Sequence, residues 1–323
     1  MIPRRRFAAL AAASTFGPPL VGRAARAQAW PTRYVRFIVP FPAGTAPDIG
    51  CRLVAARLSE MWGQQAVVEN KPGAGGNLGT EAAARSAPNG YTVLMAAFTH
   101  AVNVFLYRSV GYDPVADFEP VTLLSQQPCV MIVPNASPAH SVADFIAYAG
   151  ANRGKITYAS GGHGSSPHLC GELFKRMTGI DMTHVPYRTG AQQDLIAGHV
   201  DVMFAVAPFD LLRAGHARGL AVTSAKRVAA APGLPTITEA GVSGFDVAPW
   251  WGLFMPATTA RGIVDKLHAD TIAVLAQGDF QKKMHDLGST LIGSTPEELS
   301  RYLKAEMAKW GPVIRDANIS LDG

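Results

Sequence analysis

The chain reads Phe37-Ile-Val-Pro-Phe-Pro-Ala-Gly-Thr-Ala-Pro-Asp48 early in its length and Tyr158-Ala-Ser-Gly-Gly-His-Gly-Ser-Ser-Pro167 near its middle. In each stretch an apolar strand ends in a loop of small residues, and the loop opens a helix. Such a junction points free backbone N–H groups and the positive end of the helix dipole at one place, which favours an anion. Two junctions in separate halves of the chain therefore predict a carboxylate held in a cleft between them.

The residues around these junctions alternate between strand and helix patterns. Apolar runs predict strands at 35–39, 66–69, 92–96, 156–159, 201–206 and 220–223. Helices are expected after Thr45, which can cap with Asp48 as its capping-box partner, at 142–151, and after Ser166 as N-cap. From Arg261 onward the pattern is mostly helical. This is doubly wound α/β organisation, in which ligands bind at the carboxyl ends of strands.

Residues 1–27 have the pattern of a secretory signal peptide. Arg4, Arg5 and Arg6 precede a short apolar stretch, and Ala25-Arg26-Ala27 and Ala27-Gln28-Ala29 both fit a cleavage site. We expect cleavage near Ala27 or Ala29 and a periplasmic mature protein. The arginines also resemble a twin-arginine signal, so the export route stays open between the two systems.

Charge and cysteine content exclude several classes of protein. The first 27 residues hold five of the 29 Lys and Arg residues and no acid, which leaves 24 basic residues against 24 acidic ones. A mature chain with zero net charge has no electrostatic basis for binding nucleic acid. The three cysteines, Cys51, Cys129 and Cys170, are an odd number in an exported chain. We expect buried cysteines without a disulfide.

Three other patterns resemble functional motifs, but each favours a structural role. The glycines from Gly73 to Gly79 do not have dinucleotide-loop spacing, because position 78 is Leu. His163, His168, Cys170 and His184 match no zinc-site spacing, so no metal and no cofactor is predicted. Gly162-His163-Gly164-Ser165 lacks the order of a hydrolase elbow. An exported enzyme acting on a carboxylate or ester is therefore disfavoured, and no catalytic residue is assigned.

An ordered set of short motifs resembles one known family. The set comprises Val39-Pro-Phe-Pro-Ala-Gly, Glu69-Asn-Lys-Pro-Gly-Ala-Gly-Gly-Asn, Asn89-Gly-Tyr, Tyr112-Asp-Pro, Asp117-Phe, His168-Leu-Cys-Gly-Glu-Leu-Phe, His184-Val-Pro-Tyr, Ala197-Gly-His-Val-Asp-Val-Met-Phe, Thr223-Ser-Ala-Lys-Arg, Pro235-Thr and Trp251-Gly-Leu. In this order the motifs resemble the extracytoplasmic solute-binding proteins of tripartite tricarboxylate transporters, the Bug family. The resemblance covers residues from about 33 to 316, nearly the whole mature chain.

The resemblance implies a type II periplasmic-binding-protein fold, with two doubly wound α/β lobes joined by two crossing strands. Lobe 1 would comprise residues 30–128 and 253–323, and lobe 2 residues 129–252, with crossings near 127–133 and 248–254. It also implies a monomer that closes on a small organic carboxylate and delivers it to membrane transporter subunits. A ligand sensor that docks on a signalling receptor would bind its ligand in the same way and stays open as an alternative.

The family pattern also implies which residues surround the ligand, mostly through backbone amides and hydroxyls. Carried over by position, they are Phe41, Ala43, Gly44, Thr45, Phe98, Thr99, His100, Ser160, Gly161, His163, Gly164, Ser165, Tyr187, Arg188, Thr189 and Ala205. Arg188 could pair with the ligand or only with a surface acid.

The chain departs from the family pattern in ways that bear on its ligand. Gly44-Thr45 stands where the family usually has two glycines, the loops at 186–201 and 208–215 look shortened, and Ala205 replaces a common acid. Without that acid we expect a ligand that lacks an amino group, such as an aromatic or simple carboxylate. Apolar wall residues for such a ligand could be Phe41, Phe98, Phe209, Trp250 and Trp251, although the tryptophan pair could instead pack at the hinge.

Overall fold

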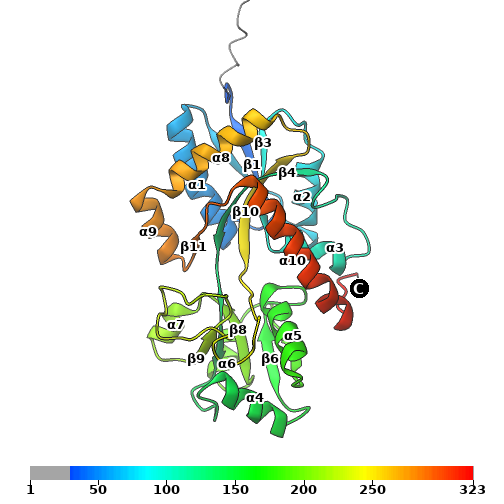
Figure 1. Cartoon of the computed structure of the whole chain (residues 1–323), viewed down its shortest axis with the longest axis vertical. Helices are drawn as coiled ribbons and strands as arrows, with labels where there is room; N and C mark the ends of the chain where they lie inside the picture. The colour runs from blue at the N-terminus through cyan, green and yellow to red at the C-terminus, as the bar shows by residue number, and fades with distance from the viewer. Residues whose placement is uncertain (1–29, 323) are drawn as a thin grey trace, which may run out of the picture.

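The computed structural model describes residues 30–322, which form two α/β lobes stacked along the long axis of the molecule (Figure 1). The predicted signal peptide and its cleavage sites lie outside the described residues. We call the lobe built on the six-stranded sheet lobe 1 and the lobe built on the five-stranded sheet lobe 2. Within the described residues, no helix is long and apolar enough to cross a membrane.

Lobe 1 has a mixed sheet with the strand order β11-β4-β10-β3-β1-β2. Strands β1, β2 and β3 are mutually parallel, and β10 runs antiparallel to both β3 and β4. The strands are β1 (Val35–Val39), β2 (Ala66–Asn70), β3 (Thr92–Ala97), β4 (Phe118–Gln126), β10 (Trp250–Pro256) and β11 (Thr290–Leu291). The helices are α1 (Ala46–Trp62), α2 (Asn77–Ala84), α3 (Thr99–Leu106), α8 (Arg261–Leu275), α9 (Gly278–Asp286) and α10 (Pro296–Asp316), with a short 3-10 turn η1 (Ala74–Gly76).

Alternating strand residues divide the lobe 1 core into two layers. Phe37 and Met95 point to the layer under α1, α8 and α9. Ile38 and Leu94 point to the opposite layer, under α2, α3 and α10. Because both faces of the sheet are covered, the central strands β3 and β10 are buried at every position.

Lobe 2 is built the same way, with the strand order β7-β6-β8-β5-β9. Strands β6, β7 and β8 are parallel, so the loops that follow them share one edge of the sheet. The elements are β5 (Cys129–Val133), α4 (Val142–Ala151), β6 (Thr157–Ser160), α5 (Ser166–Thr178), β7 (Thr183–Pro186), α6 (Ala191–Ile196), β8 (Val202–Val206), α7 (Phe209–Arg213) and β9 (Arg218–Val222).

The chain passes between the lobes twice, first between β4 and β5 and again just before β10 (Figure 1). The two passages are tied together by the Gln127 N–H, which donates to the Pro249 carbonyl at 2.7 Å. The return lies at the start of the expected range of 248–254, because the residues from Trp250 onward already pair in the lobe 1 sheet. Short crossings of this kind are suited to a hinge.

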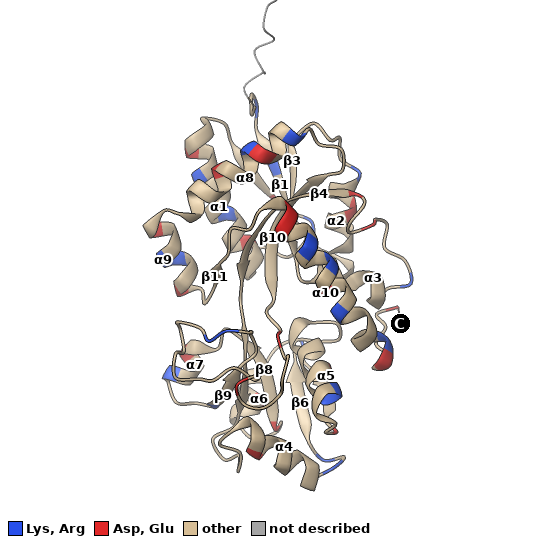
Figure 2. Ribbon diagram, viewed as in Figure 1, with Lys and Arg blue, Asp and Glu red and all other residues tan. Residues whose placement is uncertain are grey.

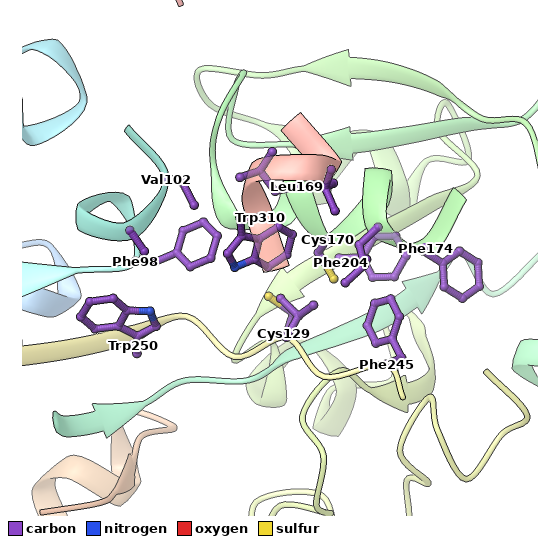
Figure 3. Packing of buried hydrophobic residues seen from close by; sticks show 14 of the residues in the cluster. Phe98, Val102, Cys129, Leu169, Cys170, Phe174, Phe204, Phe245, Trp250 and Trp310 are labelled. Atoms are coloured by element: carbon purple, nitrogen blue, oxygen red, sulfur yellow. The ribbon is translucent and has the colours of Figure 1, made fainter. Parts of the chain in front are cut away.

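One apolar cluster runs through both lobes. Phe98 of lobe 1 meets Trp310 of α10 edge to face, with ring centroids 5.2 Å apart. Trp310 belongs to the same buried cluster as Leu169 and Phe174 of α5 (Figure 3). Helix α10 thus packs on its own lobe and on lobe 2.

Two predicted helix caps are corrected by the structure. Ser165, and not Ser166, caps α5, because its side chain accepts from the His168 N–H. Thr45 does occupy the N-cap of α1, but its hydroxyl donates to the Pro42 carbonyl at 2.8 Å. Asp48 accepts from the Gly44 N–H at 2.8 Å and so turns the loop instead of completing a capping box.

Candidate functional site

A cavity of about 300 Å³ lies between the lobes, where both predicted junctions meet. Lobe 1 contributes Pro40, Phe41, Pro42, Pro72, Gly73, Gly75, Gly76, Thr99, Asn103 and Leu321, and lobe 2 contributes His163, Gly164 and Ser165. Five of the predicted site residues therefore line one cavity: Phe41, Thr99, His163, Gly164 and Ser165. Among the described residues that line it there is no Asp or Glu side chain.

The β1–α1 junction is held rigid by the buried carboxylate of Asp48. This side chain accepts from Gly44 N–H, from the Arg52 guanidinium at 3.1 Å and from Asn70 at 2.8 Å. Burial alone would raise the pKa of Asp48, but hydrogen bonds from Arg52, Gly44 and Asn70 lower it below its usual value. Asp48 thus stays ionised and fixes the loop that carries Ala43, Gly44 and Thr45, while within residues 30–322 the Ala46 N–H donates to no protein acceptor.

The β6–α5 junction is shaped by glycines in left-handed conformation. Gly162 has φ +112° and Gly164 has φ +73°, values that suit a residue without a side chain. The Ser160 hydroxyl donates to the Gly162 carbonyl and accepts from its N–H, both at 3.1 Å. In the described chain, the N–H groups of His163 and Ser166 have no protein acceptor. Gly161 is exposed in the same loop.

The β7–α6 loop, which follows the neighbouring strand, presents Tyr187, Arg188 and Thr189. The Tyr187 hydroxyl donates to Asp194 at 2.7 Å, so its proton is already used within the protein. Arg188 and Thr189 are exposed, and no carboxylate of residues 30–322 pairs with the Arg188 guanidinium. Arg188 is therefore free to face an anion.

Three predicted site residues lie instead in the core: Phe98, His100 and Ala205. His100 is fully buried in lobe 1, where its Nε2 is 3.0 Å from the Pro114 carbonyl and its ring stacks on Tyr112. Burial lowers the pKa of His100 to about 4. Ala205 is completely buried on β8, paired with Val130 of β5.

Of the expected apolar wall, only Phe41 lines the cavity. Phe98, Trp250 and Trp251 are buried in the packing of lobe 1, and Phe209 borders a different cavity beside residues 285–288. The tryptophan pair therefore packs near the hinge, which was one of the two interpretations left open.

Several lining residues were not predicted as site residues. The loop at 72–76 follows β2, and because β1 and β2 are parallel their carboxyl ends meet at the same edge. That rule could have identified Pro72, Gly73, Gly75 and Gly76. Asn103 donates to the Gly75 carbonyl at 3.1 Å and holds the loop in place. No sequence signal pointed to Leu321, which follows α10 and reaches the cavity because its N–H donates to the Leu106 carbonyl at 2.8 Å.

The charges of the two lobes are balanced, as the sequence indicated. Figure 2 shows basic and acidic residues interspersed along the helices of both lobes. The cavity is therefore not placed in a strong basic field, and its selectivity for an anion depends on local backbone donors.

Comparison with known proteins agrees with this geometry. Residues 51–319 match the model of the tripartite tricarboxylate transporter family receptor. Protein BugT of Bordetella pertussis is 32% identical over 301 residues, which cover 91% of this chain and 92% of that protein. A protein from a tcbD-tcbE intergenic region of Pseudomonas sp. strain P51 is 36% identical over 316 residues, covering 96% and 93%.

Solved structures show the same fold. R. palustris Rpa4515 with adipate has a TM-score of 0.78 at 39% identity and covers 90% of this chain and 100% of that one. MatC of Rhodopseudomonas palustris with bound malate has a TM-score of 0.74 at 32% identity, covering 88% and 100%. The chain belongs to the tripartite tricarboxylate transporter receptor family, the Bug proteins, which are periplasmic solute-binding proteins and not enzymes.

Proposed function

We propose that this protein captures a small organic carboxylate in the cavity between its lobes and delivers it to the membrane subunits of a tripartite tricarboxylate transporter. It would act in the periplasm as a monomer, after cleavage of the signal peptide near Ala27 or Ala29. The observation that supports this most directly is the meeting of the two helix-opening loops, one from each lobe, at one cavity. Relatives with adipate and with malate bound support a small carboxylate as the ligand.

Binding would rest on backbone donors and helix ends. In an open form the lobe 1 loop at 41–46 would hold one carboxylate, and closure would add the donors of the loop at 160–166. Closure also removes water, which strengthens each hydrogen bond. Arg188, which is exposed on the β7–α6 loop, would add a charged contact to the carboxylate.

The composition of the cavity favours a ligand without an ammonium group. An amino acid would need a buried acid to balance its charge, and no described lining residue is acidic. Phe41, Pro42, Pro72 and Leu321 instead offer apolar surface to the carbon chain of the ligand. Simple dicarboxylates and aromatic carboxylates are therefore the class to be tested first.

Two proline substitutions test the site with little disturbance of the fold. Ala46 and Ser166 are the first residues of α1 and α5, a position where proline is well tolerated, and each has an N–H without a protein acceptor. The residues before them, Thr45 and Ser165, are already extended. Ala46→Pro and Ser166→Pro therefore each remove one donor.

Calorimetric titration of the refolded mature chain with adipate, malate and glutamate gives the readout. A hydrogen bond to a charged group contributes about 1.5–3 kcal/mol, so each proline variant should bind its acid about ten- to a hundredfold more weakly. Gly278→Pro, at the first residue of α9 far from the cavity, is the matched control and should bind as the wild type does. Equal affinity in all three variants, or preference for glutamate over adipate and malate, would reject the proposed site or ligand class.

A further inference from the structure

We propose that His163, His168 and His184 form a binding site for one divalent transition-metal ion, such as Zn²⁺. One ring nitrogen of each histidine lies within 4.8 Å of the others. The three come from different places: His163 from the loop after β6, His168 from the first turn of α5, and His184 from β7. Metal binding here is a different role from carboxylate capture, although His163 also lines the cavity between the lobes. Imidazole nitrogens are the ligands that Zn²⁺, Cu²⁺ and Co²⁺ favour.

The arrangement combines two stacked rings with one exposed ring. His168 and His184 stack with centroids 3.9 Å apart and planes 22° apart. His163 stands nearly perpendicular to both, with centroids 5.3 Å from His168 and 4.9 Å from His184. His163 is exposed, whereas His168 is buried. An ion can therefore enter from solvent, and the ring of His163 can rotate to complete the coordination.

His184 already has the tautomer that a metal ligand needs. The Ser160 hydroxyl gives its proton to the Gly162 carbonyl, so its oxygen is left to accept from His184 Nε2–H at 2.6 Å. The lone pair is then on Nδ1. This atom is buried and has no hydrogen-bond partner in the described chain. Metal-bound histidines characteristically donate their other N–H to a fixed oxygen, as His184 does here.

His168 can join the site only if the loop adjusts. Its Nδ1 accepts from the Gly164 N–H at 3.0 Å, so its proton is on Nε2. Binding a metal through Nε2 moves that proton to Nδ1, and the Gly164 N–H must then turn away. Gly162 and Gly164 lie in this loop, and glycine can adopt backbone angles that other residues rarely adopt.

The experiment uses the mature chain without a histidine tag and with all metal removed by chelation. Titration with Co²⁺, followed by visible absorption, and with Zn²⁺, followed by calorimetry, should show one ion bound per chain. His163→Ala removes the exposed ligand without touching the core and should weaken both ions at least about tenfold. His140→Ala is the control, because His140 is an exposed histidine of lobe 2 outside the cluster, and it should bind like the wild type.

A second readout guards against metal bound elsewhere on the surface. Zn²⁺ should raise the thermal midpoint of the wild type and of His140→Ala, and it should raise that of His163→Ala much less. His184→Gln should behave like His163→Ala if circular dichroism shows that it is folded. The proposal is overturned if the wild type binds no Co²⁺ at millimolar concentration, or if His163→Ala and His140→Ala bind alike.

Discussion

Replacing Gly171 by alanine should destabilise the protein although it puts a better helix former into a helix. Gly171 lies in α5, directly over the ring of Tyr158 on β6. A Cβ at this position would lie 2.4, 2.7 and 2.9 Å from three ring carbons of Tyr158. The ring cannot easily retreat, because it is fully buried and its hydroxyl donates to Glu172. Helix and sheet must therefore separate locally.

The size of the effect follows from two opposed terms. Overpacking a core usually costs about 1–3 kcal/mol, and a clash with three ring atoms at once belongs at the upper end of that range. Alanine in place of glycine within a helix stabilises the helix by about 1 kcal/mol. The free energy of unfolding should thus fall by about 2 kcal/mol.

Gly150 in α4 provides the matched control. A Cβ there would meet nothing within 4 Å, so Gly150→Ala should raise the free energy of unfolding by about 0.5–1 kcal/mol. Urea unfolding of both variants, followed by circular dichroism, should give shifts of opposite sign. If Gly171→Ala stabilises the chain as Gly150→Ala does, α5 does not pack against Tyr158 as closely as described here. The reasoning about the β6–α5 loop, which this packing positions, would fail with it.

Three further predictions concern stability and reactivity. Burial lowers the pKa of His100 from 6.5 to about 4. Between these two pH values His100 is protonated in the unfolded chain and neutral in the folded chain. Stability should fall by up to about 3 kcal/mol as pH drops through that window, and His100→Phe should flatten this part of the urea-unfolding profile. All three cysteines are buried, and burial raises the pKa of the Cys129 thiol to about 12, so a thiol reagent should label none of them in native protein and all three in urea. Thr295→Ala breaks the capping box of α10 and should lower the free energy of unfolding by about 1 kcal/mol, whereas Thr295→Ser should change it little.

The sequence predicted the strands and the two helix-opening loops because their signals are local. The run at 35–39 is apolar except for Arg36 and is followed by a proline, which leaves few alternatives to a buried strand. The same rule located β3 and β8 to within one residue. The sequence predicted one helix-opening loop after β1 and another after β6, and Phe41 and Ser165 of these loops line one cavity although the two strands belong to different sheets.

The predictions from sequence failed where contacts between distant parts of the chain determine which residue caps a helix or which way a side chain points. Ser165 and Ser166 are equally good caps by residue type, and only the turn held by Gly162 selects the first. His100 sits one residue beyond Thr99 at a helix start, but the helix turns its ring inward toward Tyr112. The histidine cluster could not be predicted from spacing, because its third member, His184, is supplied by a neighbouring strand.

Lobe 2 is one continuous segment of chain, but part of its hydrophobic core is contributed by a helix from outside that segment. Helix α10 comes from the far end of the chain and covers the face of lobe 2 that carries Leu169 and Phe174, with Trp310 buried in the same cluster. A fragment of residues 129–249 would expose that apolar face to water, since the helix that covers it would be missing. The two lobes are therefore separate in shape but not in folding, and heating should melt them in a single cooperative step.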